Sequence, residues 1–325
     1  MTLRADEVID RRRLRRKLTF WRVAAVLLAV VAVIVAARTI VSEELSGRGV
    51  SHIAKVKIDG TITEDDELLE RLAAIRDADT VKGVILSIDS PGGTTAGGEA
   101  IYEEVRLIAA KKPVVAQVGT LAASAGYMIA SATDHIVARQ SSIVGSIGVL
   151  IQYPDVTGLM DKIGVKLEEV KSSPLKAEPS PFNPTTEPER AMIRSMIMDS
   201  YDWFVGLVEE RRSMTREQVL ALADGSIFTG RQALQNKLID ELGGEREAKA
   251  WLAGKGVDGK LEIVEWKKAQ STASLFLGSS LADTVAGALG IGSGYGQLLR
   301  EIGAERLFLD GLLSVWQPDK AVLGN

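Results

Sequence analysis

A serine at the start of an apolar helix is the residue of this sequence best placed to act as a nucleophile. Ser124 stands in the segment GTLAASAGYMIASA, residues 119–132, just after an expected loop. Backbone N–H groups at a helix start are unpaired and the helix dipole is positive there, so they would stabilise the oxyanion that attack by a serine creates. Serine is also a common helix N-cap, and capping alone is an alternative role for Ser124.

Few residues of this chain could act as the base that activates Ser124, because histidine is scarce and cysteine is absent. The chain has no cysteine, which excludes disulfides, thiolate nucleophiles and Cys-ligated zinc. Its two histidines are His52, which follows an N-terminal apolar run, and His135, which is flanked by Asp134 in the manner of a strand-edge or structural histidine. The segment around Ser124 lacks the first glycine of a G-x-S-x-G elbow and no histidine follows residue 135, which excludes an α/β-hydrolase triad. A lysine base remains, and neither a metal nor a cofactor is expected.

Lys176, in the proline-rich segment VKSSPLKAEPSPF of residues 170–182, supplies such a base. A free lysine has a pKa near 10.4, and this value must fall by about 3 units, roughly 4 kcal/mol, before a lysine acts as a base near neutrality. Burial beside apolar side chains or substrate has that effect. Two alternatives stand beside this interpretation. One is a solvated surface charge, and the other is the S-x-x-K signature of penicillin-binding enzymes, begun here by Ser173 but without the later K-T-G.

A glycine-rich turn forms a third segment with chemical potential. Residues 88–98, IDSPGGTTAGG, follow an expected buried strand. The adjacent glycines Gly92 and Gly93 accept backbone conformations that other residues avoid, which leaves N–H groups free to point into a cleft. The alternative for this segment is a tight turn without a function.

Short β-rich runs alternate with helical stretches through the body of the chain, and they must position these three segments. The pattern predicts an α/β fold with a mostly parallel sheet and crossover helices, and ligand chemistry is expected at the carboxyl ends of its strands. Strands are expected at 53–58, 81–88, 113–118, 135–138, 148–151, within 165–171 and at 261–266, and helices at 68–75, 99–110, from about 124, and at 187–212.

The N-terminus has the pattern of a membrane anchor. Residues 1–22 carry eight basic and three acidic side chains, and an apolar run follows. Residues 18–37 are long enough to form one transmembrane helix, and the basic flank predicts a cytoplasmic N-terminus. A cleaved signal peptide and a buried core helix are the alternatives. The expected organisation is a basic cytoplasmic tail (1–17), the transmembrane helix (18–37), a linker (38–52), a main domain (53–266) and a C-terminal appendage (267–325) that packs on a neighbouring subunit or on the membrane surface.

Taken together, the chemistry-bearing segments resemble the signal peptide peptidase A family of membrane-anchored serine–lysine peptidases, whose domain has the ClpP/crotonase fold. The resemblance runs from about Ile53 to Trp266. It is carried by DSPGG (89–93), AASAGYMIA (122–130), SIVGSIGVL (142–150), KSSPLKAEPSPF (171–182) and FTGRQALQNKLIDELGG (228–244).

The resemblance implies a role for each matching position. Ser124 would be the nucleophile and Lys176 the general base. The hydroxyl of Ser146 would orient the lysine amine, and the backbone N–H groups of Gly93 and Ala125 would form the oxyanion hole. The lysine would take the serine proton and later protonate the leaving amine.

Two features qualify what is carried over from the family. Many members have Ser-Gly-Gly-Tyr-Tyr where this chain has Ser-Ala-Gly-Tyr-Met, so Met128 is expected to change the pocket lining. The chain has one such domain, as the short members do, and the resemblance implies a homo-oligomer in which serine and lysine meet across or near protomer contacts.

The function expected from these observations is a membrane-bound serine endopeptidase. It would degrade cleaved signal peptides and similar unfolded apolar peptides at the outer face of the bacterial inner membrane, with its catalytic domain periplasmic or extracytoplasmic. No basic and aromatic pattern indicates nucleic acid as a partner. Two alternatives are a non-catalytic oligomeric membrane scaffold and a crotonase-type acyl-CoA enzyme, and the anchor disfavours the second because acyl-CoA is cytosolic.

Overall fold

The computed structural model describes residues 21–23, 25–26, 29, 48–267 and 313–315. Contacts divide the chain into two units, Met1–His52 and Ile53–Asn325. Within the described residues no helix combines the length and the apolar character that crossing a membrane requires. The expected basic tail and most of the expected transmembrane helix, linker and C-terminal appendage lie outside the described residues.

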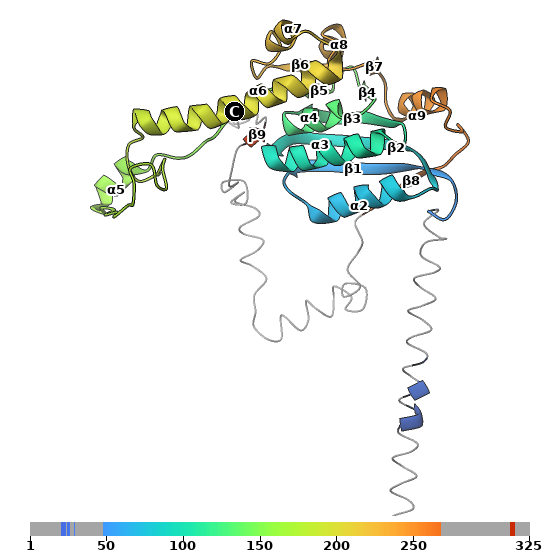
Figure 1. Cartoon of the computed structure of the whole chain (residues 1–325), viewed down its shortest axis with the longest axis horizontal. Coiled ribbons are helices and arrows are strands. Elements are labelled where there is room, and N and C mark those ends of the chain that lie inside the picture. Colours follow the sequence, from blue (N-terminus) through green and yellow to red (C-terminus); the bar gives the residue numbers. More distant parts are fainter. Residues whose placement is uncertain (1–20, 24, 27–28, 30–47, 268–312, 316–325) are drawn as a thin grey trace, which may run out of the picture. The chain divides into compact units, whose positions relative to one another are not determined.

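Strands and helices alternate through the second unit, as the sequence pattern predicts (Figure 1). The strands are β1 (His52–Ile62), β2 (Val81–Thr94), β3 (Val114–Ala123), β4 (His135–Ala138), β5 (Ile143–Gly145), β6 (Ile227–Thr229), β7 (Glu241–Leu242), β8 (Ile263–Glu265) and β9 (Leu313–Val315). The helices are α2 (Asp66–Asp77), α3 (Thr95–Ala109), α4 (Ala125–Ser131), α5 (Thr157–Ile163), α6 (Glu187–Arg212), α7 (Arg216–Leu220), α8 (Gly230–Gln235) and α9 (Glu245–Gly254).

The described strands form one sheet with the order β6-β5-β3-β2-β1-β8, while β4 pairs with β3 and β7, and β9 pairs with β2. The pairs β1–β8, β2–β3, β3–β4, β3–β5 and β4–β7 are parallel. The pairs β5–β6 and β2–β9 are antiparallel. The expected α/β fold with a mostly parallel sheet is therefore confirmed.

Both faces of the sheet are covered, which explains why its central strands are largely apolar and do not alternate strictly between apolar and polar residues. In β2, Leu86 and Ile88 pack in the core beneath α2, α3, α4 and the end of α6, whereas Ile85 packs in a second cluster with Ala248 and Leu252 of α9. Successive side chains of a strand point to opposite faces, so one run of apolar residues serves both cores.

Strand β3 changes its neighbour halfway along its length. Val115–Val118 pair with β4, and Leu121–Ala123 pair with β5. This change brings the segment after β5 beside the carboxyl end of β3, where α4 begins.

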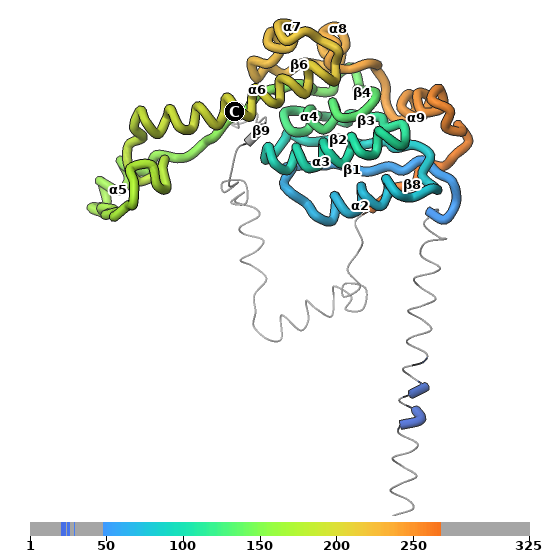
Figure 2. Tube along the Cα trace, in the orientation of Figure 1, coloured from blue at the N-terminus to red at the C-terminus, as the bar shows by residue number. Residues whose placement is uncertain are grey.

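One part of the second unit extends away from the sheet, and we call residues 151–200 the arm. It contains α5, the connecting loop and the first half of α6, and both the ribbon and the tube show it to one side of the sheet (Figures 1 and 2). The other half of α6 is anchored by Phe204, Val205 and Val208, which are buried in the main core. Helix α6 begins with a capping box formed by Thr186 and Glu189.

Two expected strands are wrong. Residues 165–171 form no strand, because they lie in the arm, where Val165, Leu167 and Val170 are exposed instead of facing a core. The strand expected at 148–151 lies earlier, as β5, because Ile143–Gly145 pairs with both β3 and β6. The apolar run that follows, including Leu150, leads out toward the arm.

Candidate active site

Ser124 occupies a sharp turn between β3 and α4. Its backbone has φ +57° and ψ −120°, which is the conformation of the first central residue of a type II′ turn and normally belongs to glycine. Such strain in a non-glycine residue persists only where the surroundings hold it, and it is concentrated at functional sites. Here the Ser124 N–H donates to the Gly145 carbonyl over 2.8 Å, and the Ser124 carbonyl accepts the Met128 N–H over 2.9 Å. The residue is 1% exposed, so its hydroxyl lies inside the fold.

Ser146 lies directly beside Ser124. Ala123 and Gly145 are partners in the parallel β3–β5 pair, so the next residue of each strand falls at the same level of the sheet. Ser146 also has a positive φ, +52°, and its N–H donates to the Ser226 carbonyl over 2.8 Å. The structure thus brings together the two serines that the sequence placed 22 positions apart.

The glycine-rich turn reaches the same edge of the sheet from β2. Ser90 is the register partner of Ala122, so the turn that contains Gly93 begins beside the carboxyl end of β3. A Cβ placed on Gly126 would lie 3.0 Å from the Ser90 carbonyl oxygen, which shows how tightly the turn and the helix pack. A Cβ on Gly93 would lie 1.7 Å from the Ile62 carbonyl oxygen, so this position accepts glycine alone.

The predicted oxyanion-hole residues, Gly93 and Ala125, therefore lie at one edge of the sheet. Ala125 is the first residue of α4, and it is buried together with Ser124. The N–H of a first helical residue has no partner within its own helix, which is the property that an oxyanion hole requires. When such N–H groups lie beside a buried serine, they favour attack by the serine oxygen on a carbonyl carbon, because they stabilise the oxyanion that forms.

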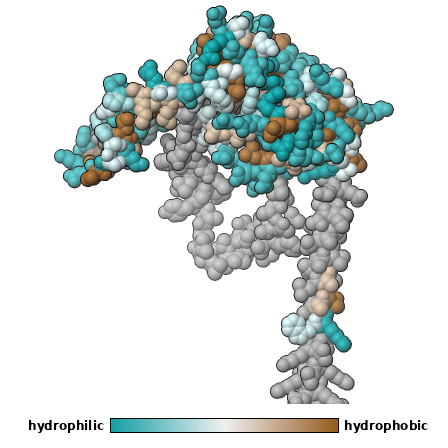
Figure 3. Space-filling view, viewed as in Figure 1, coloured by the Kyte–Doolittle hydropathy of each residue, from teal (hydrophilic) through white to brown (hydrophobic). Residues whose placement is uncertain are grey.

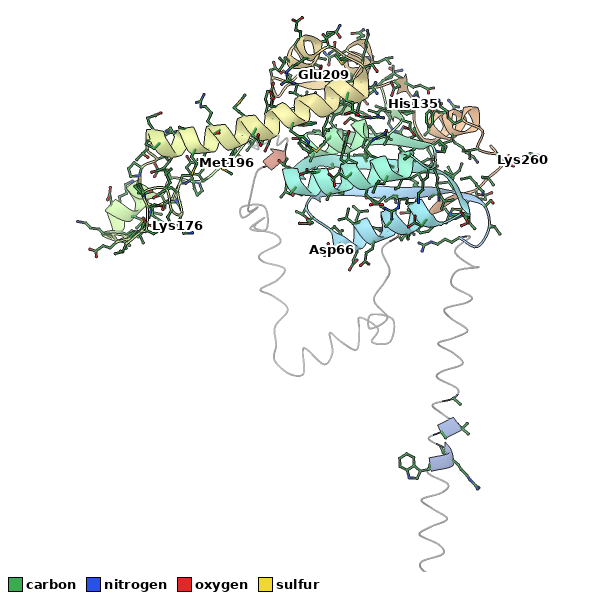
Figure 4. All side chains as sticks on the ribbon, in the orientation of Figure 1. Asp66, His135, Lys176, Met196, Glu209 and Lys260 are labelled. Atoms are coloured by element: carbon green, nitrogen blue, oxygen red, sulfur yellow. The ribbon has the colours of Figure 1, made fainter. Side chains whose placement is uncertain are left out.

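Lys176 lies elsewhere. It is exposed, in a turn of the arm where its N–H donates to the Ser173 carbonyl over 3.2 Å. Figure 4 places its side chain beside α5, at the opposite end of the arm from the sheet that holds α4. Among the described residues of one chain, the structure does not bring Lys176 to Ser124, and it does not bury Lys176 as the sequence predicted for a base.

The loop that presents Lys176 is nevertheless ordered around one buried carboxylate. The Glu178 side chain is 3% exposed. One of its oxygens accepts hydrogen bonds from the Lys171 ammonium and from the Asn183 amide at 3.1 Å, and the other accepts the Ser180 N–H at 2.7 Å. The hydrogen bond from Lys171 is the main cause that lowers the pKa of Glu178, and the bond from Asn183 adds to it. Glu178 therefore ties together both ends of the Lys176 turn.

Two site residues escaped the sequence analysis. Ser90 shapes the glycine-rich turn, because its hydroxyl donates to the Gly60 carbonyl at 2.6 Å and accepts the Gly92 N–H at 3.1 Å. Glu178 shapes the lysine loop. Both stand inside motifs that the sequence displays, DSPGG and KAEPSPF, but nothing in a linear pattern shows which member of a motif is buried.

His135 has a structural environment, as the sequence predicted. It begins β4 and stacks on Trp251 of α9 with 5.0 Å between ring centroids. Its Nε2 lies 3.2 Å from a Glu241 carboxylate oxygen. Within residues 48–267 and the other described residues, no group of three or more His, Asp or Glu side chains forms a metal site.

Sequence comparisons point to proteases. The family model described as peptidase family S49 matches residues 106–257, and the one described as Clp protease matches residues 46–148. A putative protease of Methanocaldococcus jannaschii is 38% identical over 221 residues, covering 68% of this chain and 69% of the relative. A putative signal peptide peptidase SppA of Enterococcus faecium is 33% identical over 262 residues, covering 75% and 76%. Protease 4 of Haemophilus influenzae is 36% identical over 208 residues, covering 61% of this chain and 34% of that protein.

A comparison with solved structures gives a ClpP1 mutant from Listeria monocytogenes, with a TM-score of 0.44 and 15% sequence identity. The match covers 64% of this chain and 98% of that one.

Proposed function

This chain belongs to peptidase family S49, the family of signal peptide peptidase A, and from that membership we propose that Ser124 and Lys176 are the nucleophile and general base of its peptidase reaction. The observation that carries the assignment of Ser124 is its strained backbone at the start of α4, beside the glycine-rich turn. A buried serine held in a glycine-like conformation has a structural cost that a role in capping alone does not explain.

The chemistry proceeds in two halves. Lys176 accepts the Ser124 proton as the serine oxygen attacks the carbonyl carbon of a peptide bond, and the N–H groups of Gly93 and Ala125 stabilise the oxyanion. The lysine ammonium then protonates the leaving amine, which leaves an acyl-enzyme. Water, activated by the same lysine, hydrolyses the ester and restores the serine. Ser146, beside Ser124, orients the lysine amine.

The position of Lys176 favours a base supplied by another copy of the chain. Within one chain the arm holds Lys176 away from α4 (Figure 4). The arm also exposes apolar side chains, which Figure 3 shows in brown along it, and exposed apolar groups of this extent are typical of interaction surfaces. They are Leu159, Ile163, Val165, Leu167, Val170, Leu175, Phe182, Met196 and Met198. A homo-oligomer would cover them and bring the lysine of one copy to the serine of the next.

The proposed substrates are unfolded apolar peptides, in particular signal peptides left in the membrane after secretion. The basic N-terminus followed by an apolar run supports an anchor in the bacterial inner membrane with the peptidase domain on its outer side. The name of the Enterococcus faecium relative supports the same substrate class.

Hydrolysis of a synthetic apolar signal peptide by the detergent-purified full chain tests the dyad. Ser124→Ala and Lys176→Ala are each expected to lose at least about 10³-fold in kcat while the protein still assembles. Ser172→Ala and Lys166→Ala, at exposed residues of the arm, are the matched controls and should hydrolyse the peptide as the wild type does. Full activity in either dyad variant would overturn the assignment. An inactive wild type in which a serine-reactive probe leaves Ser124 unlabelled would favour the non-catalytic scaffold.

A further inference from the structure

The helix that follows Ser124 is short, and its position depends on contacts at its far end. Helix α4 has seven residues, and the last four carbonyl groups of a helix have no partner within it. At 1.5 Å per residue, the end of α4 at Ser131 lies about 10 Å along the helix axis from Ser124. The three consecutive carbonyls of Ser131, Ala132 and Thr133 at this end all accept hydrogen bonds from arginine side chains.

Two arginines from different helices bind these carbonyls. Arg106 of α3 donates from Nη1 to the middle carbonyl over 2.8 Å. Arg211 of α6 donates from Nε to the Ser131 carbonyl and from Nη2 to the Thr133 carbonyl, each over 3.2 Å. With respect to the side chains that the structure describes, Arg211 forms no ion pair with a carboxylate. Its half-buried guanidinium thus serves backbone carbonyls at the end of α4.

The next residue of α6 binds a different segment. Successive residues of a helix are about 100° apart around its axis, so Arg211 and Arg212 leave α6 in different directions. Arg212 donates to the Lys237 carbonyl over 2.9 Å and to both carboxylate oxygens of Asp240 over 2.8 and 2.9 Å. The last turn of α6 therefore holds the end of α4 through one arginine and the segment 237–240 through the other.

The strained backbone of Ser124 requires that α4 be fixed at both ends. A residue keeps a φ of +57° only where its surroundings prevent relaxation. At the start of α4, the hydrogen bond from the Ser124 N–H to the Gly145 carbonyl fixes the turn. At the far end, the arginines prevent the helix from moving in a direction that would relieve the strain.

Resting on the proposed function, we propose that Arg211 is a positioning residue for Ser124. By binding the carbonyls of Ser131 and Thr133, it keeps α4 and the strained turn in place. It acts through α4 on the serine of its own chain, and not through the other half of α6 on Lys176. Without Arg211, the turn relaxes and the serine oxygen leaves the position from which it attacks. Because Arg211 lies at the far end of α4 from Ser124, its loss affects kcat and leaves KM unchanged.

The first test compares Arg211→Ala with Arg212→Ala in the full-length chain. Arg211→Ala is expected to hydrolyse the apolar signal peptide with a kcat about tenfold lower than that of the wild type at the same KM. Arg212→Ala is the matched control, because it removes the neighbouring guanidinium, whose side chain is 9% exposed. It should lower the denaturant midpoint at least as much and keep kcat within about twofold of the wild type. An unchanged kcat in Arg211→Ala, or an equal loss in both variants, would overturn the inference.

A second readout is independent of activity. Hydrogen–deuterium exchange of the α4 amides, residues 125–131, is expected to be faster in Arg211→Ala than in the wild type and in Arg212→Ala. Exchange of these amides that is equal in the two variants would show that Arg211 does not fix α4.

Mixed assemblies test whether Arg211 acts on the serine or on the lysine. Under the proposed function, Lys176→Ala supplies the intact serine and Ser124→Ala the intact lysine when the two are unfolded, mixed and reassembled. Arg211→Ala added to the chain that supplies the serine is expected to lower the regained activity about tenfold. Added to the chain that supplies the lysine, it should leave the regained activity unchanged. An equal loss in both arrangements, or a loss in the second alone, would overturn the action through α4.

These results separate the inference from the proposed function. Full activity of Ser124→Ala would overturn the proposed function. An inactive Ser124→Ala beside an Arg211→Ala variant with wild-type kcat would overturn the inference alone. If the mixed assemblies regain no activity even with Arg211 intact, the lysine is supplied within one chain, and the kcat comparison of Arg211→Ala with Arg212→Ala decides the inference.

Discussion

The edge of the sheet around Ser124 and the arm around Lys176 are built in opposite ways. At the sheet edge three chain segments converge, and each is fixed by strand register: the turn after β2, the start of α4 after β3, and Ser146 after β5. In the arm, Lys176 is exposed on a loop held by local hydrogen bonds around Glu178. One half of the proposed catalytic site is complete within a single chain, and the other half is presented outward.

This difference shows which parts of the molecule fix the positions of the proposed catalytic residues. Strained backbone at Ser124 is maintained by the buried sheet on which it stands, whereas a loop on an extended arm acquires a defined position relative to the sheet only through further contacts. The arm also carries the exposed apolar side chains that such contacts would cover. The proposed oligomer would therefore both bury the arm and complete the active site.

Mixing two inactive variants is the strongest test of whether the sheet edge of one chain and the arm of another form one active site. Ser124→Ala and Lys176→Ala, each with at least about 10³-fold reduced activity, are expected to regain about a quarter of wild-type activity when unfolded, mixed in equal amounts and reassembled, because one junction in four then pairs an intact serine with an intact lysine. Peptide hydrolysis by the mixture is the measurement.

The double variant Ser124→Ala with Lys176→Ala, mixed with wild type, is the control, since it contributes neither an intact serine nor an intact lysine. If the two single variants stay inactive together while the wild type survives the same procedure, the lysine is supplied within one chain and the contrast between sheet edge and arm fails.

Glycine-to-alanine changes compare the two regions directly. Gly93→Ala is expected to reduce kcat about 10²-fold or more and to destabilise the fold by about 3 kcal/mol, because the new Cβ would lie 1.7 Å from the Ile62 carbonyl oxygen. Gly158→Ala in α5 of the arm meets nothing within 4 Å and is expected to stay within about 1 kcal/mol of the wild type. Denaturant unfolding and peptide hydrolysis measure both effects, and equal behaviour of the two variants would contradict the comparison.

Glu178→Gln tests whether the lysine loop needs its buried carboxylate. The change keeps the size of the side chain but removes the charge that holds Lys171, so Lys176 loses its defined position and kcat is expected to fall about tenfold. Glu187→Gln, in the same arm, has a side chain that is 93% exposed and should leave kcat unchanged. Because the pKa of Glu178 is lowered in the folded protein, the loop should hold at neutral pH and loosen as the pH falls through that lowered value. A Glu178→Gln variant with wild-type kcat would show that Glu178 does not position Lys176.

An effect on stability and not on catalysis is expected where α6 joins the sheet. Arg212 donates to both oxygens of Asp240 at 2.8 and 2.9 Å, and Asp240 also accepts the Ile136 N–H of β4 at 2.8 Å. Burial acts to raise the pKa of Asp240, but the hydrogen bonds and charge of Arg212, with smaller effects from Ile136 and His135, lower it overall. The Arg212–Asp240 ion pair should therefore stabilise the fold above pH about 4, which is the pKa of an unfolded aspartate. Its effect should be lost as the pH falls through the lower pKa that Asp240 has in the folded protein.

Asp240→Asn checks this expectation. It should reduce the free energy of unfolding by about 2 kcal/mol at pH 7 and by less at pH 3, because below pH about 4 the unfolded aspartate binds a proton and part of the stabilisation is lost. Denaturant unfolding at the two pH values is the measurement. A loss that is the same at both values would show that Asp240 acts through packing and not through its charge.

Much of the fold follows from local sequence patterns. The spacing of apolar residues shows which face of a helix or strand must be buried, and that spacing does not depend on distant parts of the chain. The strand at 135–138 and the helix at 187–212 have the bounds that the sequence predicts. The strand expected at 165–171 is wrong, because Val165, Leu167 and Val170 stand among charged residues but have no neighbouring strand to pair with in the described part of the chain. Hydrophobic alternation predicts a strand only where a partner exists, and the partner is a property of the whole fold.

By itself, the sequence determined the α/β class, the absence of a thiol, and the motifs that contain Ser124, Ser146, Gly93 and Lys176. Residue types and short-range spacing suffice for these, because chemistry depends on the side chain and strand or helix formation on a few neighbours. Only the tertiary structure decided that, among the described residues of one chain, two of the motifs meet Ser124 while the lysine motif does not. Register between β2, β3 and β5 sets the first result, and the outward path of the arm sets the second. Both depend on pairings between residues far apart along the chain, which no local pattern encodes.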